Sequence, residues 1–186
     1  MISKILSRMF LVVALVGLAG LPMKNALAAD PENTLYLDLQ YGRVVIELRP
    51  DLAPTHVARI KELTREGFYD GVKFHRVIED FMAQTGDPTG TGRGGSGRKL
   101  RSEFTNTPHV RGTVSMARAQ SPHSADSQFF IVLAETPHLN GKYTVWGQVI
   151  EGMEYVDLIR KGVGSSGMVP GEPDIIVKMQ VAADAG

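Results

Sequence analysis

The chain of 186 residues contains no cysteine. This absence excludes disulfide bonds, thiolate zinc sites, iron–sulfur clusters and a cysteine nucleophile. The five histidines show no metal-binding spacing such as H-E-x-x-H, and no G-x-S-x-G sequence indicates a serine hydrolase. We therefore expect no metal and no cofactor, and either a binding protein or an enzyme whose reaction needs no covalent intermediate.

Residues 1–28 lack acidic side chains and carry three basic ones. An apolar run of 13 residues, 9–21, follows the positively charged start, and Ala26-Leu27-Ala28 has the small–x–small pattern of a cleavage site. The run is shorter than the roughly 20 residues that a membrane span needs, which disfavours the alternative of an uncleaved anchor. We predict a cleaved signal peptide over 1–28 and a single exported domain over 29–186.

The remaining chain has a small excess of negative charge. The whole sequence is neutral, with 20 basic and 20 acidic side chains, so residues 29–186 hold 17 basic and 20 acidic ones. A weakly acidic domain argues against broad nucleic-acid binding. The 43% hydrophobic and 22% charged composition is ordinary for a soluble globular domain.

The hydrophobic pattern of the domain is mainly that of β-strands. Leu35, Leu37 and Leu39 lie on one face of the segment 35–40, and Val44, Ile46 and Leu48 on one face of the segment 44–48, as in a hairpin with one buried face. Further short strands are expected at 72–78, 81–85, 112–117, 127–133, 143–150 and 175–181, and helices at 54–67 and 151–161. Two helices are too few to connect a parallel sheet. The pattern favours an antiparallel sheet closed as a barrel.

Two glycine-rich segments match the dinucleotide-binding pattern G-x-G-x-x-G, at 90–95 and 162–167. Neither has the strand before and the helix after that such a site requires, so we expect no nucleotide cofactor. A basic cluster, Arg93, Arg98, Lys99 and Arg101, lies in and after the first segment. Its two interpretations are a solvated loop and a contact with an anionic partner.

Three segments of the chain resemble the cyclophilins, a family of peptidyl-prolyl cis–trans isomerases. Residues 74–87 read FHRVIEDFMAQTGD, residues 112–118 and 127–131 read GTVSMAR and SQFFI, and residues 139–147 read LNGKYTVWG. The likeness extends from about Leu35 to Val181. It implies a closed eight-stranded antiparallel barrel capped by two α-helices, a substrate groove outside the barrel, no cofactor, and the periplasmic bacterial branch of the family.

The resemblance also implies the roles of single residues. Arg76 matches the catalytic arginine, and Gln84 matches the residue that orients it. The expected substrate-binding residues are Phe81, Met82, Ala117, Arg118, Gln128, Phe130, His138, Leu139 and Tyr143. The alternative for Arg76 is a structural ion pair with Glu79 or Asp80. Because side chains alternate along a strand, Phe129 should lie in the core, and so should Trp146.

Three positions depart from the family pattern. His138 stands where cyclosporin-sensitive members carry Trp, Tyr143 where many carry His, and Arg118 where many carry Asn. We therefore expect weak cyclosporin binding with activity retained. The expected partners are proline-containing, flexible polypeptide segments, with no nucleic acid and no stable membrane association after cleavage, and the protein should be a monomer. The competing function is a chaperone or scaffold that binds without turnover.

Overall fold

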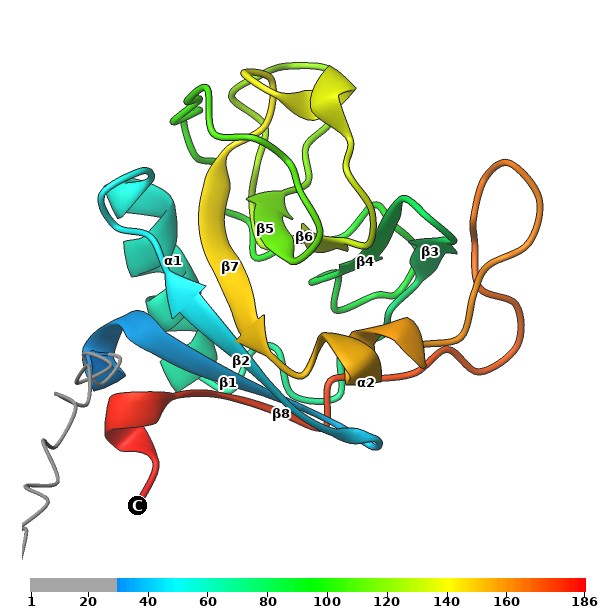
Figure 1. Cartoon of the computed structure of the whole chain (residues 1–186), viewed down its shortest axis with the longest axis horizontal. Coiled ribbons are helices and arrows are strands. Elements are labelled where there is room, and N and C mark those ends of the chain that lie inside the picture. The colour runs from blue at the N-terminus through cyan, green and yellow to red at the C-terminus, as the bar shows by residue number, and fades with distance from the viewer. Residues whose placement is uncertain (1–29) are drawn as a thin grey trace, which may run out of the picture.

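Eight strands form one antiparallel sheet in residues 30–186, the part of the chain that the computed structural model describes. Their order across the sheet is β3-β4-β6-β5-β7-β2-β1-β8. The strands are β1 (Thr34–Leu39), β2 (Gly42–Leu48), β3 (Arg76–Ile78), β4 (Met82–Thr85), β5 (Thr113–Met116), β6 (Phe129–Val132), β7 (Val145–Glu151) and β8 (Lys178–Val181). Helices α1 (Pro54–Arg65) and α2 (Met153–Asp157) accompany the sheet, with short 3-10 turns η1 (Pro31–Asn33), η2 (Pro137–Leu139) and η3 (Ala182–Asp184) (Figure 1). The expected signal peptide lies outside the described residues.

The prediction of eight antiparallel strands and two helices is confirmed, but the prediction of a closed barrel is wrong. The sheet curls into an open half-barrel with β3 and β8 at its edges. The outer edge of β3 pairs with a loop, because Val77 N–H donates to the Gly167 carbonyl at 2.8 Å and Gly162 N–H donates to the Val77 carbonyl at 2.9 Å. These backbone groups are then no longer available for a ladder with β8. The segments before the two edge strands meet at one isolated bridge, between Lys73 and Ile175.

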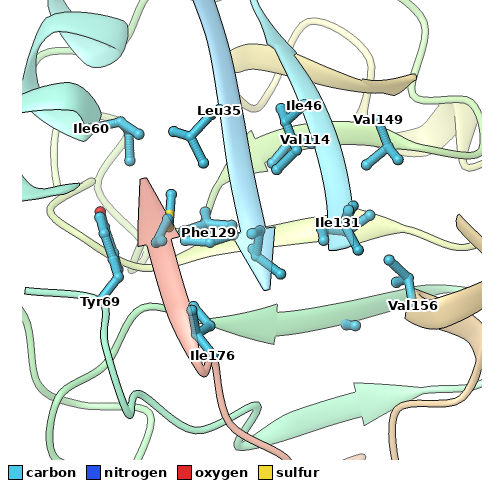
Figure 2. Close-up of a cluster of buried hydrophobic side chains, with 14 of the residues drawn as sticks. Leu35, Ile46, Ile60, Tyr69, Val114, Phe129, Ile131, Val149, Val156 and Ile176 are labelled. Atoms are coloured by element: carbon cyan, nitrogen blue, oxygen red, sulfur yellow. The ribbon is translucent and has the colours of Figure 1, made fainter. Parts of the chain in front are cut away.

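Strand alternation places one face of the sheet in the core. Leu35 and Leu37 of β1 and Val44 and Ile46 of β2 are fully buried, as the period of two predicts. Figure 2 shows side chains from the strands and from α1 and α2 converging on this cluster, including Phe129. The predicted core positions of Phe129 and Trp146 are confirmed, since both are fully buried and their rings pack edge to face at 5.3 Å.

Helix α1 begins without a side-chain cap from its own N-cap residue, Ala53. The carboxylate of Glu103, distant in the sequence, supplies that cap by accepting hydrogen bonds from the N–H groups of Thr55 and His56 at 3.1 Å each. Pro54 fits the first turn because its missing N–H costs no helical hydrogen bond there. In the described part of the chain, no helix is long and apolar enough to cross a membrane.

The last strand differs from its predicted register. The sequence predicts Ile175, Val177, Met179 and Val181 on one buried face. Ile175 and Val177 are instead exposed, whereas Ile176 is fully buried. The regular ladder with β1 starts only at Lys178, and before it the Ile176 N–H bonds to the Val72 carbonyl at 2.9 Å, which turns that side chain inward. A tertiary contact therefore overrides the alternation at this point.

Two other elements are shorter than predicted. The strand expected over 72–78 contains only Arg76–Ile78, because the preceding backbone pairs with residues 174–176 in isolated contacts. The helix expected over 151–161 contains only Met153–Asp157, although Val156 is fully buried and Ile159 nearly so. These differences move the ends of elements and leave the order of the fold unchanged.

Candidate active site

Strand register brings residues from four strands into one row on the face of the sheet opposite the main core. Arg76 of β3 lies opposite Gln84 of β4, Gln84 lies opposite Phe130 of β6, and Phe130 lies opposite Ser115 of β5. Directly opposed residues in antiparallel strands point to the same face. Residues that are far apart in the sequence therefore meet at one place, which no local pattern shows.

A small cavity of about 110 Å³ opens beside this row. Its lining contains nine of the eleven residues assigned to the site from the sequence: Arg76, Phe81, Met82, Gln84, Ala117, Arg118, Phe130, Leu139 and Tyr143. Four of them, Met82, Ala117, Phe130 and Leu139, form with Val132 a buried hydrophobic cluster separate from the main core. Phe81 and Tyr143 pack against this cluster as partly buried residues. The cavity therefore has apolar walls with one cationic side.

The guanidinium of Arg76 is held in place by neutral acceptors. Its Nε donates to the Ser166 carbonyl at 2.9 Å and its Nη1 donates to Gln84 Oε1 at 3.2 Å. No carboxylate pairs with it among residues 30–186, so the alternative of an ion pair with Glu79 or Asp80 is wrong. Burial lowers the pKa of Arg76, yet a guanidinium remains charged at neutral pH. The Nη2 group makes no hydrogen bond within the described residues.

A chain of hydrogen bonds leads from Arg76 to the glycine-rich loop. Gln84 accepts from Arg76 and donates through Nε2 to Gln128 Oε1 at 2.9 Å. Gln128 in turn donates through Nε2 to the Gly94 carbonyl at 2.8 Å. The two glutamines thus have fixed amide orientations, and Gln128 reaches the site through Gln84 without lining the small cavity.

The wall behind Phe130 contains a buried histidine that the sequence did not assign to the site. The ring of His109 stacks on Phe130 with centroids 6.3 Å apart. Its Nδ1 lies 3.1 Å from Asn140 Oδ1 and its Nε2 lies 2.9 Å from Ser115 Oγ. Burial lowers the pKa of His109, which favours the neutral ring that donates to Asn140 and accepts from Ser115. Phe130 is therefore supported by a rigid polar group.

The rim of the cavity carries the three residues that depart from the family pattern. The Arg118 guanidinium lies 4.7 Å from the centre of the Tyr143 ring, and its nitrogens donate to three backbone carbonyls. The Tyr143 ring packs edge to face against Phe130 at 5.7 Å. His138 is exposed and its ring lies 5.6 Å from that of Phe81. His138 therefore borders the site without lining the cavity.

Two backbone features of the site were not predicted. The loop 162–168 lies beside β3 (Figure 1) and supplies the Ser166 carbonyl that holds Arg76. The loop 90–95 is anchored by Asp87, whose carboxylate accepts from the N–H groups of Thr89 at 2.8 Å and Gly94 at 3.1 Å. Burial alone would raise the pKa of Asp87, but these hydrogen bonds lower it to about 2. Both loops contain the glycine patterns noted in the sequence, and they serve here to position the site.

The described residues contain no group of three or more His, Cys, Asp or Glu side chains that could hold a metal ion. The loops 90–95 and 162–167 are not strand-to-helix turns, so neither has the geometry of a dinucleotide site. The cavity offers an apolar wall, an arginine whose Nη2 donor has no partner in the described part of the chain, and polar groups fixed by hydrogen bonds. Such a site can bind a small ring and donate a hydrogen bond to one edge of it.

Comparison with known sequences identifies a family over nearly the whole described chain. A family described as "Cyclophilin type peptidyl-prolyl cis-trans isomerase/CLD" matches residues 34–181. A "Probable peptidyl-prolyl cis-trans isomerase" of Brucella suis is 51% identical over 183 residues, covering 92% of this chain and 93% of the relative. "Peptidyl-prolyl cis-trans isomerase B" of Bacillus subtilis is 45% identical over 133 residues, covering 70% of this chain and 92% of the relative.

Solved structures of cyclophilins are also similar to this chain. Cyclophilin AquaCyp293 from Hirschia baltica superposes with a TM-score of 0.74 at 31% identity, covering 85% of this chain and 77% of that one. A cyclophilin-type isomerase of Cryptosporidium parvum, crystallised in the presence of the dipeptide Ala-Pro, superposes with a TM-score of 0.73 at 32% identity. The match covers 80% of this chain and 98% of that one.

Proposed function

This chain belongs to the cyclophilin-type peptidyl-prolyl cis–trans isomerases and is an enzyme of that type, and from this premise we propose that Arg76 catalyses X–Pro rotation in exported, folding polypeptides. The observation that carries the proposal is the position of Arg76 in the lining of the small cavity, with an Nη2 donor that has no acceptor among residues 30–186. The protein acts as a monomer on flexible, proline-containing segments.

The chemistry of the reaction suits these residues. Rotation about a peptide bond meets a barrier of about 18–20 kcal/mol, although the cis and trans X–Pro forms differ by only about 0.5–1 kcal/mol. No covalent bond breaks, so no nucleophile is needed. In the twisted amide the proline nitrogen becomes pyramidal and gains a lone pair, which can accept a hydrogen bond. A donor that interacts more strongly with this state than with the planar amide lowers the barrier.

Arg76 has the fixed geometry that such a donor requires. Two of its nitrogens are occupied by Ser166 and Gln84, so the guanidinium plane does not need to reorganise during the reaction. The apolar wall of Phe81, Met82 and Phe130 holds the proline ring and excludes water from the donor. An acceleration of about 10⁵ requires about 7 kcal/mol, which exceeds the roughly 1.5–3 kcal/mol of one charge-assisted hydrogen bond. The pocket must therefore supply part of the effect.

Substrate backbone would bind along Ala117 and Arg118, just beyond the end of β5. The Ala117 N–H donates to the Gln128 carbonyl at 2.9 Å. The backbone N–H and carbonyl of Arg118 make no hydrogen bond within residues 30–186. These groups can pair with an extended peptide as an added strand would. This contact would involve only the main chain of the substrate, so it is compatible with many substrate sequences.

Cyclosporin is expected to bind this enzyme with a dissociation constant weaker than about 1 μM while isomerase activity is retained. His138, exposed at the rim beside Phe81, offers a smaller apolar surface than the Trp of sensitive members. The variant His138→Trp should bind at least about tenfold more tightly, because an added aromatic contact of this size contributes more than about 1.4 kcal/mol. Isothermal titration calorimetry measures both constants, and a submicromolar value for the wild type would contradict the expectation.

The export part of the proposal rests on residues 1–28, with their basic start, short apolar run and Ala-Leu-Ala end. We expect cleavage after Ala28, which leaves a protein that begins at Ala29. Expression of the full chain in a Gram-negative host, followed by periplasmic extraction and intact-mass measurement, tests this. Recovery of the uncleaved chain from the cytoplasm would refute the export assignment.

A further inference from the structure

A second cavity of about 330 Å³ adjoins the candidate proline pocket. The two cavities share Gln84, Ala117 and Arg118 in their linings, so they lie side by side along the line where a substrate backbone would run. The far side of the second cavity is formed by the glycine-rich loop, including Arg93. Part of the basic cluster seen in the sequence therefore lies next to the active site.

The spacing of an extended peptide determines which substrate residue enters this cavity. The residue before a proline is restricted to extended conformations. In an extended chain, side chains alternate, and residues two apart lie about 7 Å from each other on the same face. When the proline ring occupies the small pocket, the residue two positions before it therefore points toward the same surface, where the second cavity shares Gln84, Ala117 and Arg118 with the first.

The side chains around the second cavity carry more positive than negative charge. Three basic residues, Arg93, Lys99 and Arg118, line it together with one acidic residue, Asp126. Asp126 is engaged internally, since it accepts hydrogen bonds from the Ser96 N–H at 2.7 Å and from Lys99 at 3.2 Å. Arg118 donates only to carbonyls, which do not neutralise its charge. The excess charge is thus that of Arg93 and Arg118.

Arg93 is exposed but its backbone is fixed. Its side chain makes no hydrogen bond or ion pair within the described chain, and its N–H lies 3.3 Å from Thr91 Oγ1. The neighbouring Gly94 is held between Asp87 and Gln128, and a Cβ there would lie 2.1 Å from Asp87 Oδ1, so no larger residue fits. The loop therefore presents to the cavity a guanidinium that has no partner among residues 30–186.

We propose that Arg93 makes this isomerase selective for substrates with an acidic side chain two residues before the proline. The inference rests on the proposed function and names the substrate class of the same site. A Glu or Asp carboxylate at that position would meet Arg93, with Arg118 adding to the positive potential. Because these charges are partly exposed, the selectivity is moderate and depends on ionic strength.

The test uses three capped peptides of the form X-Ala-Pro-Phe, with X as Glu, Gln or Lys, and measures kcat/KM by NMR exchange at low ionic strength. The wild type should favour the Glu peptide over the Gln peptide by about threefold, and over the Lys peptide by about tenfold. In about 0.5 M salt the Glu to Lys ratio should fall toward one. Ratios near one at low salt would overturn the proposal.

Two charge reversals within the basic cluster, at Arg93 and at Arg98, test whether the effect comes from Arg93. Arg93→Glu should bring the Glu to Lys ratio to one or below. The matched control, Arg98→Glu, changes the same charge on a side chain that pairs with Glu62 of α1 and does not line the cavity. It should keep the wild-type ratio, and an equal response of the two variants would refute the role of Arg93. Arg93→Gln, with an intermediate ratio, confirms that charge is the cause.

The neutral Gln peptide separates this inference from the proposed function. If the wild type accelerates exchange of the Gln peptide but shows no preference among the three peptides, only the proposed selectivity for acidic substrates is refuted. If the wild type accelerates none of the three peptides, the proposed function itself fails.

Discussion

Replacing Arg76 with alanine is expected to lower kcat/KM for a short Ala-Pro peptide by about 100-fold, with little loss of stability. The guanidinium lines the small cavity, and its Nη2 group has no acceptor among residues 30–186. Loss of a charge-assisted hydrogen bond made in the transition state costs about 1.5–3 kcal/mol, which corresponds to roughly 10- to 150-fold in rate. NMR exchange on the wild type and the variant gives both rates.

The free energy of unfolding should change little, because Arg76 pairs with no carboxylate in residues 30–186 and its partners Ser166 and Gln84 are neutral. The variant Arg76→Lys retains the charge but loses the planar guanidinium that reaches both Ser166 and Gln84. Its kcat/KM should therefore lie near that of the variant Arg76→Ala. Arg43→Ala is a matched control, since Arg43 pairs with Asp38 away from the cavity. It should keep full activity. Full activity in Arg76→Ala would refute the assignment of this residue as catalytic.

The adjacent phenylalanines of β6 are expected to separate stability from activity. Phe129 is fully buried in the main core between Tyr69 and Trp146, and Phe129→Ala should cost about 3–5 kcal/mol of unfolding free energy. Phe130 lines the small cavity on the other face of the same strand. Phe130→Ala should cost less stability, about 2 kcal/mol, but lower kcat/KM by about 10- to 100-fold through loss of contact with the proline ring.

Chemical denaturation and NMR exchange on the two variants provide the measurement. Rates must be taken where each variant is folded, so the activity of Phe129→Ala is compared per folded molecule. Phe129→Leu, which keeps most of the apolar volume, should recover stability without affecting the rate. If Phe129→Ala lost activity per folded molecule as strongly as Phe130→Ala, the division of β6 into a core face and a substrate face would be wrong.

The sequence predicts the fold best where apolar side chains recur with a regular local period. The alternation in β1 and β2 correctly identifies which of their side chains are buried, because a strand exposes and buries side chains with a period of two. The same rule fails before β8, where Ile176 is buried by backbone pairing with Val72. That contact joins residues about 100 positions apart, so no local pattern encodes it.

In the candidate site, too, some residues are predictable from the sequence and others are not. The motifs around Arg76 and Phe130 predict the site residues because the family pattern is long and specific. Nine of the eleven residues assigned in this way line the small cavity. His109 escaped assignment because its role depends on Ser115 and Asn140, which reach it only in the folded chain. A buried histidine outside a motif has no sequence signal that distinguishes it from any other.

By itself the sequence determined the mainly β class, the order of the elements and the core faces of β1 and β2, and its family motifs contain nine of the residues around the small cavity. The tertiary structure decided that the sheet stays open, since a loop 90 positions beyond Arg76 occupies the edge of β3 and holds its guanidinium. It also decided that Arg93, which the sequence could assign only to a basic loop, lines a cavity beside the pocket. The physical reason is the same in both cases: loop positions depend on long-range hydrogen bonds, whereas strand faces follow from neighbouring residues.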